Sequence, residues 1–334
     1  MRWLARLLPR RTHFVGIDVG TAETKMAEIR VTNGGPEVLA LRRLPSPPGV
    51  WGDVFDEEKL IGVLRELEPG TREVISCLPG DKVVSRILRL PPMSDREREQ
   101  AVRLEVERFL PTPVDELIIR SVWLEDKAGG EGRRCLILAV PAALVYRYHA
   151  LFSRAGLVLG VLDLPAFALH RLFQPQLQEG SVALVDIGAR ITQIVIMQNG
   201  QIVFLRTLSA GGDLFTRSAS EHYGVTFEEA ERMKLEAAAT VEDPSAAEAF
   251  RGGLLEIGRE LKRSLEFCST QEGIEVRKII LSGGGAKFRP LPTFLEGMLG
   301  VPVTVDTPAL TFSSLSYDPA YAVALGLALR EVVV

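Results

Sequence analysis

The chain has 334 residues, of which 46% are hydrophobic and 25% are charged, a balance typical of globular proteins. The formal net charge of −4 argues against a general nucleic-acid-binding protein, and no nucleic-acid partner is expected. The three cysteines and four histidines are scattered, which argues against a disulfide framework and a His/Cys metal cluster and favours a reducing cytoplasm.

The first residues, MRWLARLLPRR, are basic and apolar. Their apolar part is too short for a signal peptide, and no apolar run in the chain reaches the ~18 residues that span a bilayer. We interpret residues 1–13 as a frayed N-terminal extension, with weak contact to an anionic membrane surface as the alternative.

The stretch from residue 14 recurs from residue 182. FVGIDVGTAETKMAEIRV and VALVDIGARITQIVIMQ align at one constant offset, which pairs Asp18 with Asp186 and Gly20 with Gly188. Each copy predicts an apolar strand, a D-x-G turn and a second strand, then an Asn/Gly hairpin turn and a third strand. The repeat predicts a duplicated architecture.

The two D-x-G turns are expected to face each other across one polyphosphate. Glycine lets backbone N–H groups approach phosphate oxygens, whereas aspartate repels phosphate but suits the water ligands of Mg²⁺. We therefore expect Asp18 and Asp186 to hold Mg²⁺ through water. Lys25 can neutralise phosphate or point to solvent. The nucleotide-binding residues expected at the turns are Asp18, Gly20, Thr21, Ala22, Lys25, Asp186, Gly188 and Ala189.

A third glycine-rich site follows an apolar strand that begins at Val276. Gly283, Gly284 and Gly285 can present bare backbone to a flat ligand, so we expect the nucleoside there. Thr226 and Glu229 form a capping box, which predicts a helix. On that helix Glu231 and Lys234 either recognise the ribose or form a surface ion pair. Two further glycines are expected in a loop beneath the nucleotide: Gly211 and Gly212.

A separate unit is predicted within the first half. Ser94 and Glu97 form a capping box, and the following helix has an apolar face. Pro111 and Pro113 end this helix, and two strands and another helix follow. The residues of the apolar face are Val102, Val106, Phe109 and Leu110.

The order of these motifs resembles the actin/Hsp70/sugar-kinase superfamily, and four stretches resemble the PilM family of type IV pilus assembly. These stretches are GIDVGTAETKMAEI, the predicted inserted unit, the segment from VDIGARITQ to EEAERMK, and RSLEFCST to LGVPV. The inserted unit carries the E-x-E-x-F-x-P pattern that distinguishes the family, formed by Glu105, Glu107, Phe109 and Pro111. The resemblance covers nearly the whole chain after residue 13.

The resemblance implies an α/β fold related to FtsA. Two actin-like, ribonuclease-H-like domains should flank a nucleotide cleft, and a small α/β subdomain should be inserted in the first half. The expected limits are 1–13 for the extension, 14–72 and 163–180 for the first domain, 73–162 for the SHS2-like insertion, and 181–334 for the second domain with the adenosine site.

The resemblance also implies a function. It indicates a cytoplasmic adaptor at the inner face of the inner membrane that binds ATP and Mg²⁺. The adaptor grips the N-terminal cytoplasmic peptide of PilN between the inserted subdomain and the first domain, and it links the pilus motor to the alignment complex. Membrane association is expected only through this partner. Candidate groove residues are Glu105, Phe109 and Leu110, although the two apolar side chains can equally pack on the subdomain's own sheet.

One position departs from filament-forming relatives. Leu164 precedes Pro165 where those relatives carry a glutamate that positions the attacking water, and Asp163 is expected to point elsewhere. A leucine cannot orient water, so we expect slow or negligible ATP hydrolysis. Arg190, in the second turn, can contact a terminal phosphate or extend into solvent.

Two alternative functions are retained. A small-molecule kinase of the same superfamily would need a second pocket with a catalytic acid. An FtsA-like division protein would carry an amphipathic membrane-targeting helix, whereas AVALGLALREVVV predicts a core helix with a short tail.

Overall fold

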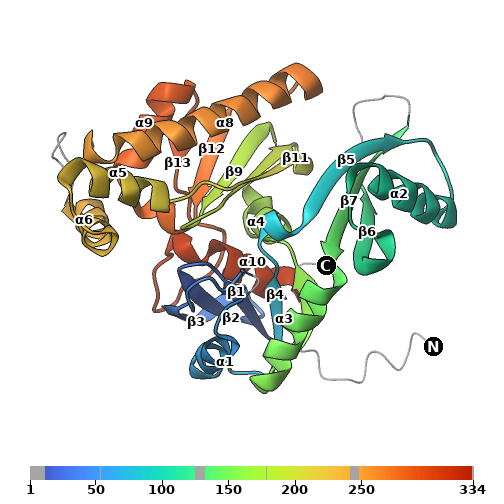
Figure 1. The fold of residues 1–334 in the computed structure, drawn as a ribbon, viewed down its shortest axis with the longest axis horizontal. Coiled ribbons are helices and arrows are strands. Elements are labelled where there is room, and N and C mark those ends of the chain that lie inside the picture. The colour runs from blue at the N-terminus through green and yellow to red at the C-terminus, as the bar shows by residue number, and fades with distance from the viewer. Residues whose placement is uncertain (1–11, 53, 125–131, 178, 241–247, 333–334) are drawn as a thin grey trace.

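The structure is a computed structural model that describes residues 12–52, 54–124, 132–177, 179–240 and 248–332. These residues form two five-stranded sheets and one three-stranded sheet (Figure 1). The N-terminal segment 1–11 lies outside the described residues, so the two interpretations of it are not decided.

The first sheet is built around the first D-x-G turn. β1, β2 and β3 are antiparallel, and β4 and β8 run parallel to β1. The inner strands are apolar and largely buried, as the pattern predicts. In spatial order the strands are β3 (Gly35–Pro45), β2 (Glu23–Thr32), β1 (His13–Val19), β4 (Glu73–Cys77) and β8 (Val158–Asp163).

The second sheet repeats the first strand for strand, which confirms the predicted duplication. The hairpin between its second and third strands turns at Asn199 and Gly200, with the positive φ of 50° and 78° that an Asn-Gly turn favours. In the first hairpin the positive φ falls instead on Gly35, at 105°. In spatial order the strands are β11 (Gln201–Leu208), β10 (Thr192–Gln198), β9 (Ser181–Ile187), β12 (Lys278–Ser282) and β13 (Val303–Thr304).

Two helices cross between the sheets and join them into one core. α4 (Pro165–Phe173) packs against β10, and α10 (Ala322–Ala328) packs against β1, β2 and α4. Glycine permits both close approaches. A Cβ on Gly16 would lie 2.1 Å from the Ala324 carbonyl oxygen, and one on Gly326 would lie 2.0 Å from the Ala168 carbonyl oxygen. The predicted closing core helix is therefore α10.

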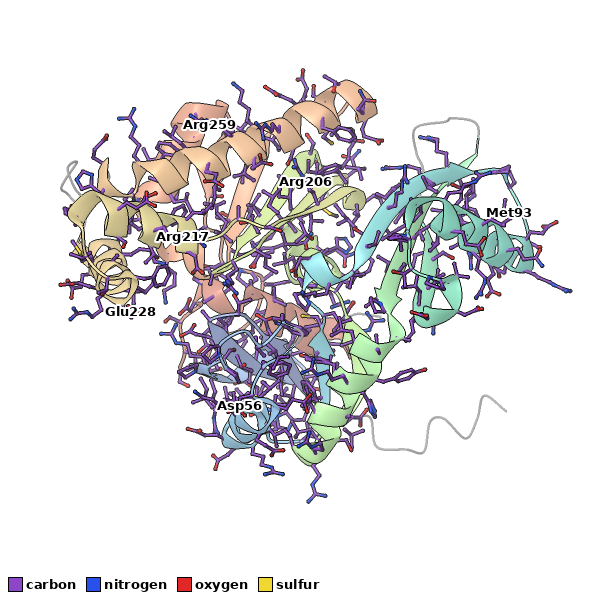
Figure 2. The ribbon with its side chains drawn as sticks, in the orientation of Figure 1. Asp56, Met93, Arg206, Arg217, Glu228 and Arg259 are labelled. Carbon is purple, nitrogen blue, oxygen red and sulfur yellow. The ribbon has the colours of Figure 1, made fainter. Side chains whose placement is uncertain are left out.

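Helices cover the outer faces of both sheets (Figure 1). β11 is hydrogen-bonded to the longest of these helices, which spans Arg251–Glu272. Arg206 of β11, labelled in Figure 2, donates to Ser264 and Glu260 of this helix at 2.9 Å each. No helix of the described part has both the length and the apolarity to cross a membrane. The helices are α1 (Glu57–Glu66) on the first sheet and α5 (Asp213–Tyr223), α6 (Phe227–Thr240), α8 (Arg251–Glu272) and α9 (Pro290–Leu299) on the second.

The inserted unit is a three-stranded antiparallel sheet under one helix. Its strands lie in the order β5 (Val84–Leu90), β7 (Arg133–Pro141) and β6 (Leu117–Trp123). α2 (Asp95–Phe109) covers one face and begins with the predicted capping box, in which Ser94 and Glu97 bond reciprocally. Val102 and Val106 of this helix are buried against the sheet, as its apolar face predicts.

The structure favours narrower limits for the insertion than 73–162. β4 and β8 belong to the first sheet, and α3 (Ala142–Arg154) buries Tyr148 and Phe152 in the core of the first domain. We propose that the inserted subdomain extends from about residue 79 to about residue 141. α10 likewise lies at the end of the 181–334 range but packs on the first sheet. Contacts between distant segments decide which domain an element belongs to, and its position in the chain does not.

Candidate functional site

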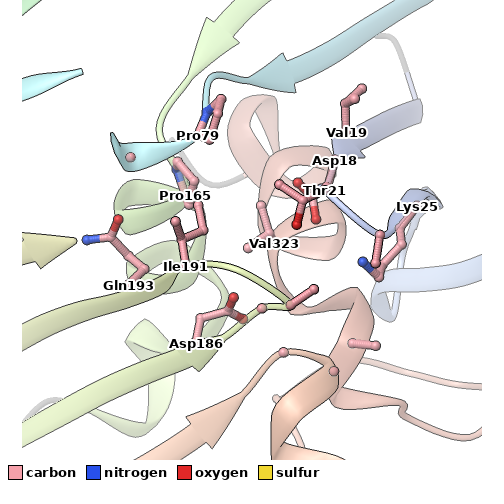
Figure 3. Close-up of a pocket in the computed structure, with 18 of the residues that line it drawn as sticks. Asp18, Val19, Thr21, Lys25, Pro79, Pro165, Asp186, Ile191, Gln193 and Val323 are labelled. Carbon is pink, nitrogen blue, oxygen red and sulfur yellow. The ribbon is translucent and has the colours of Figure 1, made fainter. Parts of the chain in front are cut away.

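The two D-x-G turns meet at one cavity. Asp18 and Asp186 are the next-to-last residues of β1 and β9, and both line a cavity of about 90 Å³ (Figure 3). The same cavity is lined by residues from both halves of the chain. Those predicted from the sequence are Asp18, Gly20, Thr21, Ala22, Lys25, Asp186, Gly188, Ala189, Gly283 and Gly284.

Both turns close by the same hydrogen bond. Gly20 N donates to the Glu23 carbonyl at 3.1 Å, and Gly188 N donates to the Ile191 carbonyl at 2.9 Å. A Cβ at Gly20 would lie 2.7 Å from the Glu23 carbonyl oxygen, and a Cβ at Gly188 would lie 3.0 Å from the Ile191 carbonyl oxygen. Glycine is therefore required to close the turn. The N–H groups of Gly20 and Gly188 are therefore used within the turns.

The two carboxylates are half-buried at the cavity wall. Desolvation, together with the charge of Asp18, raises the pKa of Asp186 to about 6, against the opposing effect of the hydrogen bond that Ser282 Oγ donates to it at 2.8 Å. Burial also raises the pKa of Asp18, against the opposing effect of Lys25. Two desolvated acids that repel each other favour a bound cation, so the donor set fits Mg²⁺ with retained waters.

Lys25 points into the site. Its side chain lines the cavity with the two aspartates (Figure 3), and Nζ lies 3.4 Å from the Glu23 carbonyl oxygen. The sequence left its direction open. The structure places its ammonium beside the turns, where it offsets negative charge.

A larger cavity of about 490 Å³ continues from the first. The two share wall residues from both turns, including Lys25 and Gly188. This second cavity brings together Gly212, Glu231, Lys234 and Gly285. Because the two cavities share these walls, we treat them as parts of one cleft.

Glu231 and Lys234 form an ion pair of 2.6 Å on the wall of this cleft. Lys234 also donates to Thr216 Oγ1 at 2.9 Å, and its side chain is only 14% exposed. Lys234 is therefore largely shielded from solvent, whereas the Glu231 side chain is 36% exposed, and both residues line the cavity. Helix α6 begins as predicted, with Glu229 N donating to Thr226 Oγ1 at 3.2 Å.

The remaining predicted glycines divide by role. A Cβ on Gly283, whose φ is 82°, would lie 2.4 Å from the Ile187 carbonyl oxygen, and a Cβ on Gly285 would lie 2.5 Å from the Ile187 side chain. A Cβ on Gly211 would lie 2.6 Å from the Ala189 carbonyl oxygen. These three glycines permit close packing, whereas a Cβ on Gly284 would meet nothing within 4 Å and would enter the cavity.

Several cavity residues were not predicted from the sequence. Arg43 pairs with Lys25 in the β2–β3 register, so the hairpin register would have indicated it. Gln193 is the second residue of β10, directly after the second turn. Trp51 also lines the cavity and donates its Nε1–H to the Val19 carbonyl at 2.8 Å. Other unpredicted wall residues are Pro79, Gly80 and Lys287.

Pro165 lines the aspartate cavity, but the neighbouring acid does not. The Asp163 carboxylate is paired with Arg171 at 2.9 Å and Arg330 at 2.7 Å, so it points elsewhere, as expected. Arg190 lines an adjoining cavity of about 230 Å³ and lies 3.8 Å from Asp213. Its side chain is 62% exposed, so it extends toward solvent.

The candidate groove residues lie on the inserted subdomain, away from the cleft (Figure 1). Phe109 and Leu110 pack partly buried against the subdomain core, and Arg86 stacks over the Phe109 ring at 5.0 Å. Glu105 is paired with Arg108 at 2.6 Å. Packing on the subdomain therefore accounts for part of the apolar face, and Phe109 and Leu110 both remain partly exposed.

Two sheets of equal strand order, joined by crossing helices and separated by a cleft with one aspartate from each, define an actin-like protein. The inserted three-stranded sheet in the first half separates it from simpler members of that class. The chain belongs to the type IV pilus assembly protein PilM family, whose sequence model matches residues 16–332. The family and the actin-like α/β fold predicted from the sequence are thereby confirmed.

Solved structures and curated relatives agree with this placement. A chain of the PilM-PilN type IV pilus biogenesis complex is similar with a TM-score of 0.84 and 29% identity, over 97% of this chain and 99% of that one. A Bacteroides thetaiotaomicron protein with an actin-like ATPase fold gives a TM-score of 0.50 and 9% identity, over 88% and 91%. Cell division protein FtsA of Bacillus subtilis is 21% identical over 66% of this chain, which spans only 57% of FtsA.

Proposed function

We propose that this chain is an ATP-binding adaptor of type IV pilus assembly that binds the N-terminal cytoplasmic peptide of PilN at the inner face of the inner membrane. The observation that carries the nucleotide part is the meeting of Asp18 and Asp186, one from each half, in a single cleft. Family membership and the similarity to the PilM-PilN complex support the partner. Through PilN, the adaptor links the cytoplasmic pilus motor and other inner-membrane pilus proteins to the alignment complex.

Each part of the cleft suits one part of Mg-ATP. Asp18 and Asp186 hold the waters of Mg²⁺, which supplies positive charge that screens the phosphates from both acids. Lys25 and the Thr21 hydroxyl bind phosphate oxygens. Because Gly20 and Gly188 use their own N–H groups to close the turns, the phosphate-facing amides are those of the following residues, Thr21, Ala22 and Ala189.

The larger cavity receives the nucleoside. Glu231 and Lys234 are oriented by each other and by Thr216, so they present a fixed acceptor and donor to the ribose hydroxyls. Gly284 leaves open backbone for the base. Gly211 and Gly212 pack against the second turn and stabilise it, since Gly212 N donates to the Gly188 carbonyl at 2.8 Å.

Hydrolysis is slow in this proposal because the described residues that line the aspartate cavity offer no carboxylate or imidazole besides Asp18 and Asp186, which hold the waters of Mg²⁺. Pro165 forms the wall there and Leu164 carries no acid. The Gln193 side chain also lines this cavity, but its amide is already hydrogen-bonded. Thr207 Oγ1 donates to its Oε1 at 2.9 Å, and its Nε2 donates to the Arg206 carbonyl at 3.1 Å.

The partner peptide occupies the groove between the inserted subdomain and the first domain. Glu105 offers a carboxylate to a basic peptide group, and the accessible sides of Phe109 and Leu110 offer apolar contact. This assignment follows from the family and from the accessible end of α2.

A small-molecule kinase is the second candidate, because one observation favours it. The cavity of about 230 Å³ adjoins the aspartate cavity through Thr21 and Trp51 and is lined by Asp81, an acid that could serve as the base for a second substrate. Release of ADP that depends on an added metabolite would identify a kinase. Release that is slow with every metabolite would support the adaptor.

Calorimetric titration with Mg-ATP tests the nucleotide site. We expect binding by the wild-type chain, loss of binding in Asp186→Ala, and retained binding in Glu256→Gln, which removes an exposed carboxylate of α8. A folded wild-type chain that does not bind Mg-ATP would contradict the proposed nucleotide site. Titration with a synthetic PilN N-terminal peptide tests the partner separately.

A further inference from the structure

The inserted subdomain is joined by the chain only to the first domain, yet it also contacts the second. β5 and η2 (Gly80–Lys82), which lead into the subdomain from β4, lie beside β11, the edge strand of the second sheet (Figure 1). Two specific contacts hold this junction, and they occur at separate points of β11.

The first contact is made by Arg134 of β7. Only 6% of this residue is exposed, which is unusual for arginine and requires partners for its charge. Its guanidinium donates to the Val203 carbonyl of β11 and lies 3.6 Å from the Glu272 carboxylate at the end of α8. Every one of these partners belongs to the second domain.

A β-bulge makes the Val203 carbonyl available. In the β10–β11 register Ile196 pairs with Phe204 and Met197 pairs with Ile202, so Val203 is the extra residue and has no opposite neighbour. A bulge redirects the backbone groups of the extra residue away from the ladder. Here the redirected carbonyl meets an arginine of another structural unit.

The second contact is a close approach at Gly80. A Cβ at this position would lie 2.4 Å from Gln193 Oε1 and 2.4 Å from Thr207 Oγ1. Gln193 and Thr207 are themselves hydrogen-bonded at 2.9 Å. Because Gly80 and Gln193 both line the aspartate cavity, this contact is part of the cleft wall.

We propose that Arg134 and Gly80 form a two-point latch that fixes the inserted subdomain to β11 of the second domain. The points of contact on β11, Val203 and Thr207, are four residues apart, or roughly 13 Å along a strand. Attachment at two separated points restrains rotation as well as translation. The position of the subdomain is therefore set by the second domain and not only by its covalent connections.

The latch also defines a route of regulation, which rests on the proposed function. Closure of the cleft on Mg-ATP moves β10 and β11 relative to the first domain, and the latched subdomain moves with them. The groove between the subdomain and the first domain then changes width with the nucleotide state, because one of its walls is attached across the cleft.

Spin labels test the latch without any ligand. The three native cysteines are buried, so labels attach selectively to cysteines introduced at exposed Leu104 of α2 and exposed Glu221 of α5. We expect pulsed electron paramagnetic resonance to give one narrow distance distribution in the otherwise wild-type chain. Arg134→Met should broaden and shift it, whereas Arg120→Met, which removes an exposed arginine of the same subdomain, should leave it unchanged. An unchanged distribution in Arg134→Met would overturn the latch.

Substitution of Gly80 tests the second contact of the latch independently of Arg134. Gly80→Ala should shift the same distribution, because the new methyl group must displace Gln193 or Thr207. Gly62→Ala, in α1, is the matched control, since a Cβ there meets nothing within 4 Å. Equal distributions for both variants would remove Gly80 from the latch.

Adding Mg-ATP separates the latch from the proposed function. A shift of the wild-type distance that is lost in Arg134→Met supports the regulatory route. Bound nucleotide with no shift overturns that route but leaves the latch. Failure to bind Mg-ATP overturns the proposed nucleotide site, while the ligand-free comparison of Arg134→Met with Arg120→Met still stands.

Discussion

At the scale of single residues, the cleft stores unfavourable electrostatic energy. Asp18 and Asp186 lie half-buried in the cleft, where desolvation raises the pKa of both carboxyls and the charge of Asp18 also opposes ionisation of Asp186. Such sites are typical of functional positions, because a ligand can supply the missing charge.

Asp186 should make the ligand-free protein less stable as pH rises. Its pKa is about 6 in the folded state against an ordinary 3.8, so between these values the folded state keeps a proton that the unfolded chain has lost. Stability that is present below about pH 4 is therefore lost as pH rises through about 6, by roughly 3 kcal/mol for this one group. Asp186→Asn keeps the Ser282 hydrogen bond and should flatten this dependence in denaturant titrations at pH 4.5 and 7.5. An unchanged slope would contradict the burial of this carboxylate.

Leu164 should limit ATP turnover. Leu164→Glu restores an acid directly before Pro165, which lines the aspartate cavity, and should raise a slow turnover. Leu164→Gln is the matched control, because glutamine has nearly the same shape as glutamate but cannot act as a base. Phosphate release over hours measures both. Brisk wild-type turnover that neither change affects would show that the missing acid is irrelevant.

At the scale of elements, local patterns predicted local structure well. The D-x-G turns, the Ser94 capping box and the glycine turn after β12 all form where the sequence indicates them, because each depends on residues close in the chain. The membership of β4, β8 and α10 was not predicted, since parallel pairing and helix exchange depend on contacts between distant segments. For the same reason Arg43 and Gln193 were not predicted as cavity residues, because their positions depend on the β2–β3 and β10–β11 strand registers.

The crossing of α4 and α10 should depend on Gly326. An alanine there would place a methyl group 2.0 Å from the Ala168 carbonyl oxygen, so the helices must separate. We expect Gly326→Ala to destabilise the protein by several kcal/mol, the range of overpacked or disrupted cores. Gly297→Ala in α9, where a Cβ meets nothing within 4 Å, should be neutral or slightly stabilising. Thermal unfolding of the two variants measures the difference, and equal melting temperatures would contradict the close packing.

At the scale of the whole molecule, the two halves share one core but keep a cleft between them. The helices α4 and α10 pack on each other between the two sheets and form a common base (Figure 1), and the two D-x-G turns line the cleft. This arrangement allows closure around a nucleotide without disturbing the core, as in hinge motions of packed domains.

Coupling between nucleotide and partner is the prediction at this scale. We expect the PilN peptide to bind about fivefold or more tightly in saturating Mg-ATP, which is the lower range of typical allosteric coupling. In Asp186→Ala the affinity should not respond to Mg-ATP. Equal affinities in the wild-type chain would remove the switch and leave a constitutive adaptor.

Trp51 gives the cleft an intrinsic optical signal. Its indole forms part of the aspartate cavity, is anchored to Val19 and stacks near Tyr148, with ring centroids 5.2 Å apart. Trp123 lies in the inserted subdomain beside Arg98 and Arg133, remote from that cavity. The sequence has one further tryptophan, Trp3. In a chain in which Trp3 is replaced by phenylalanine, emission from Trp51 should respond to cavity occupancy and emission from Trp123 to rearrangement of the insertion, so that replacing either of these two by phenylalanine assigns a fluorescence change to one unit of the molecule.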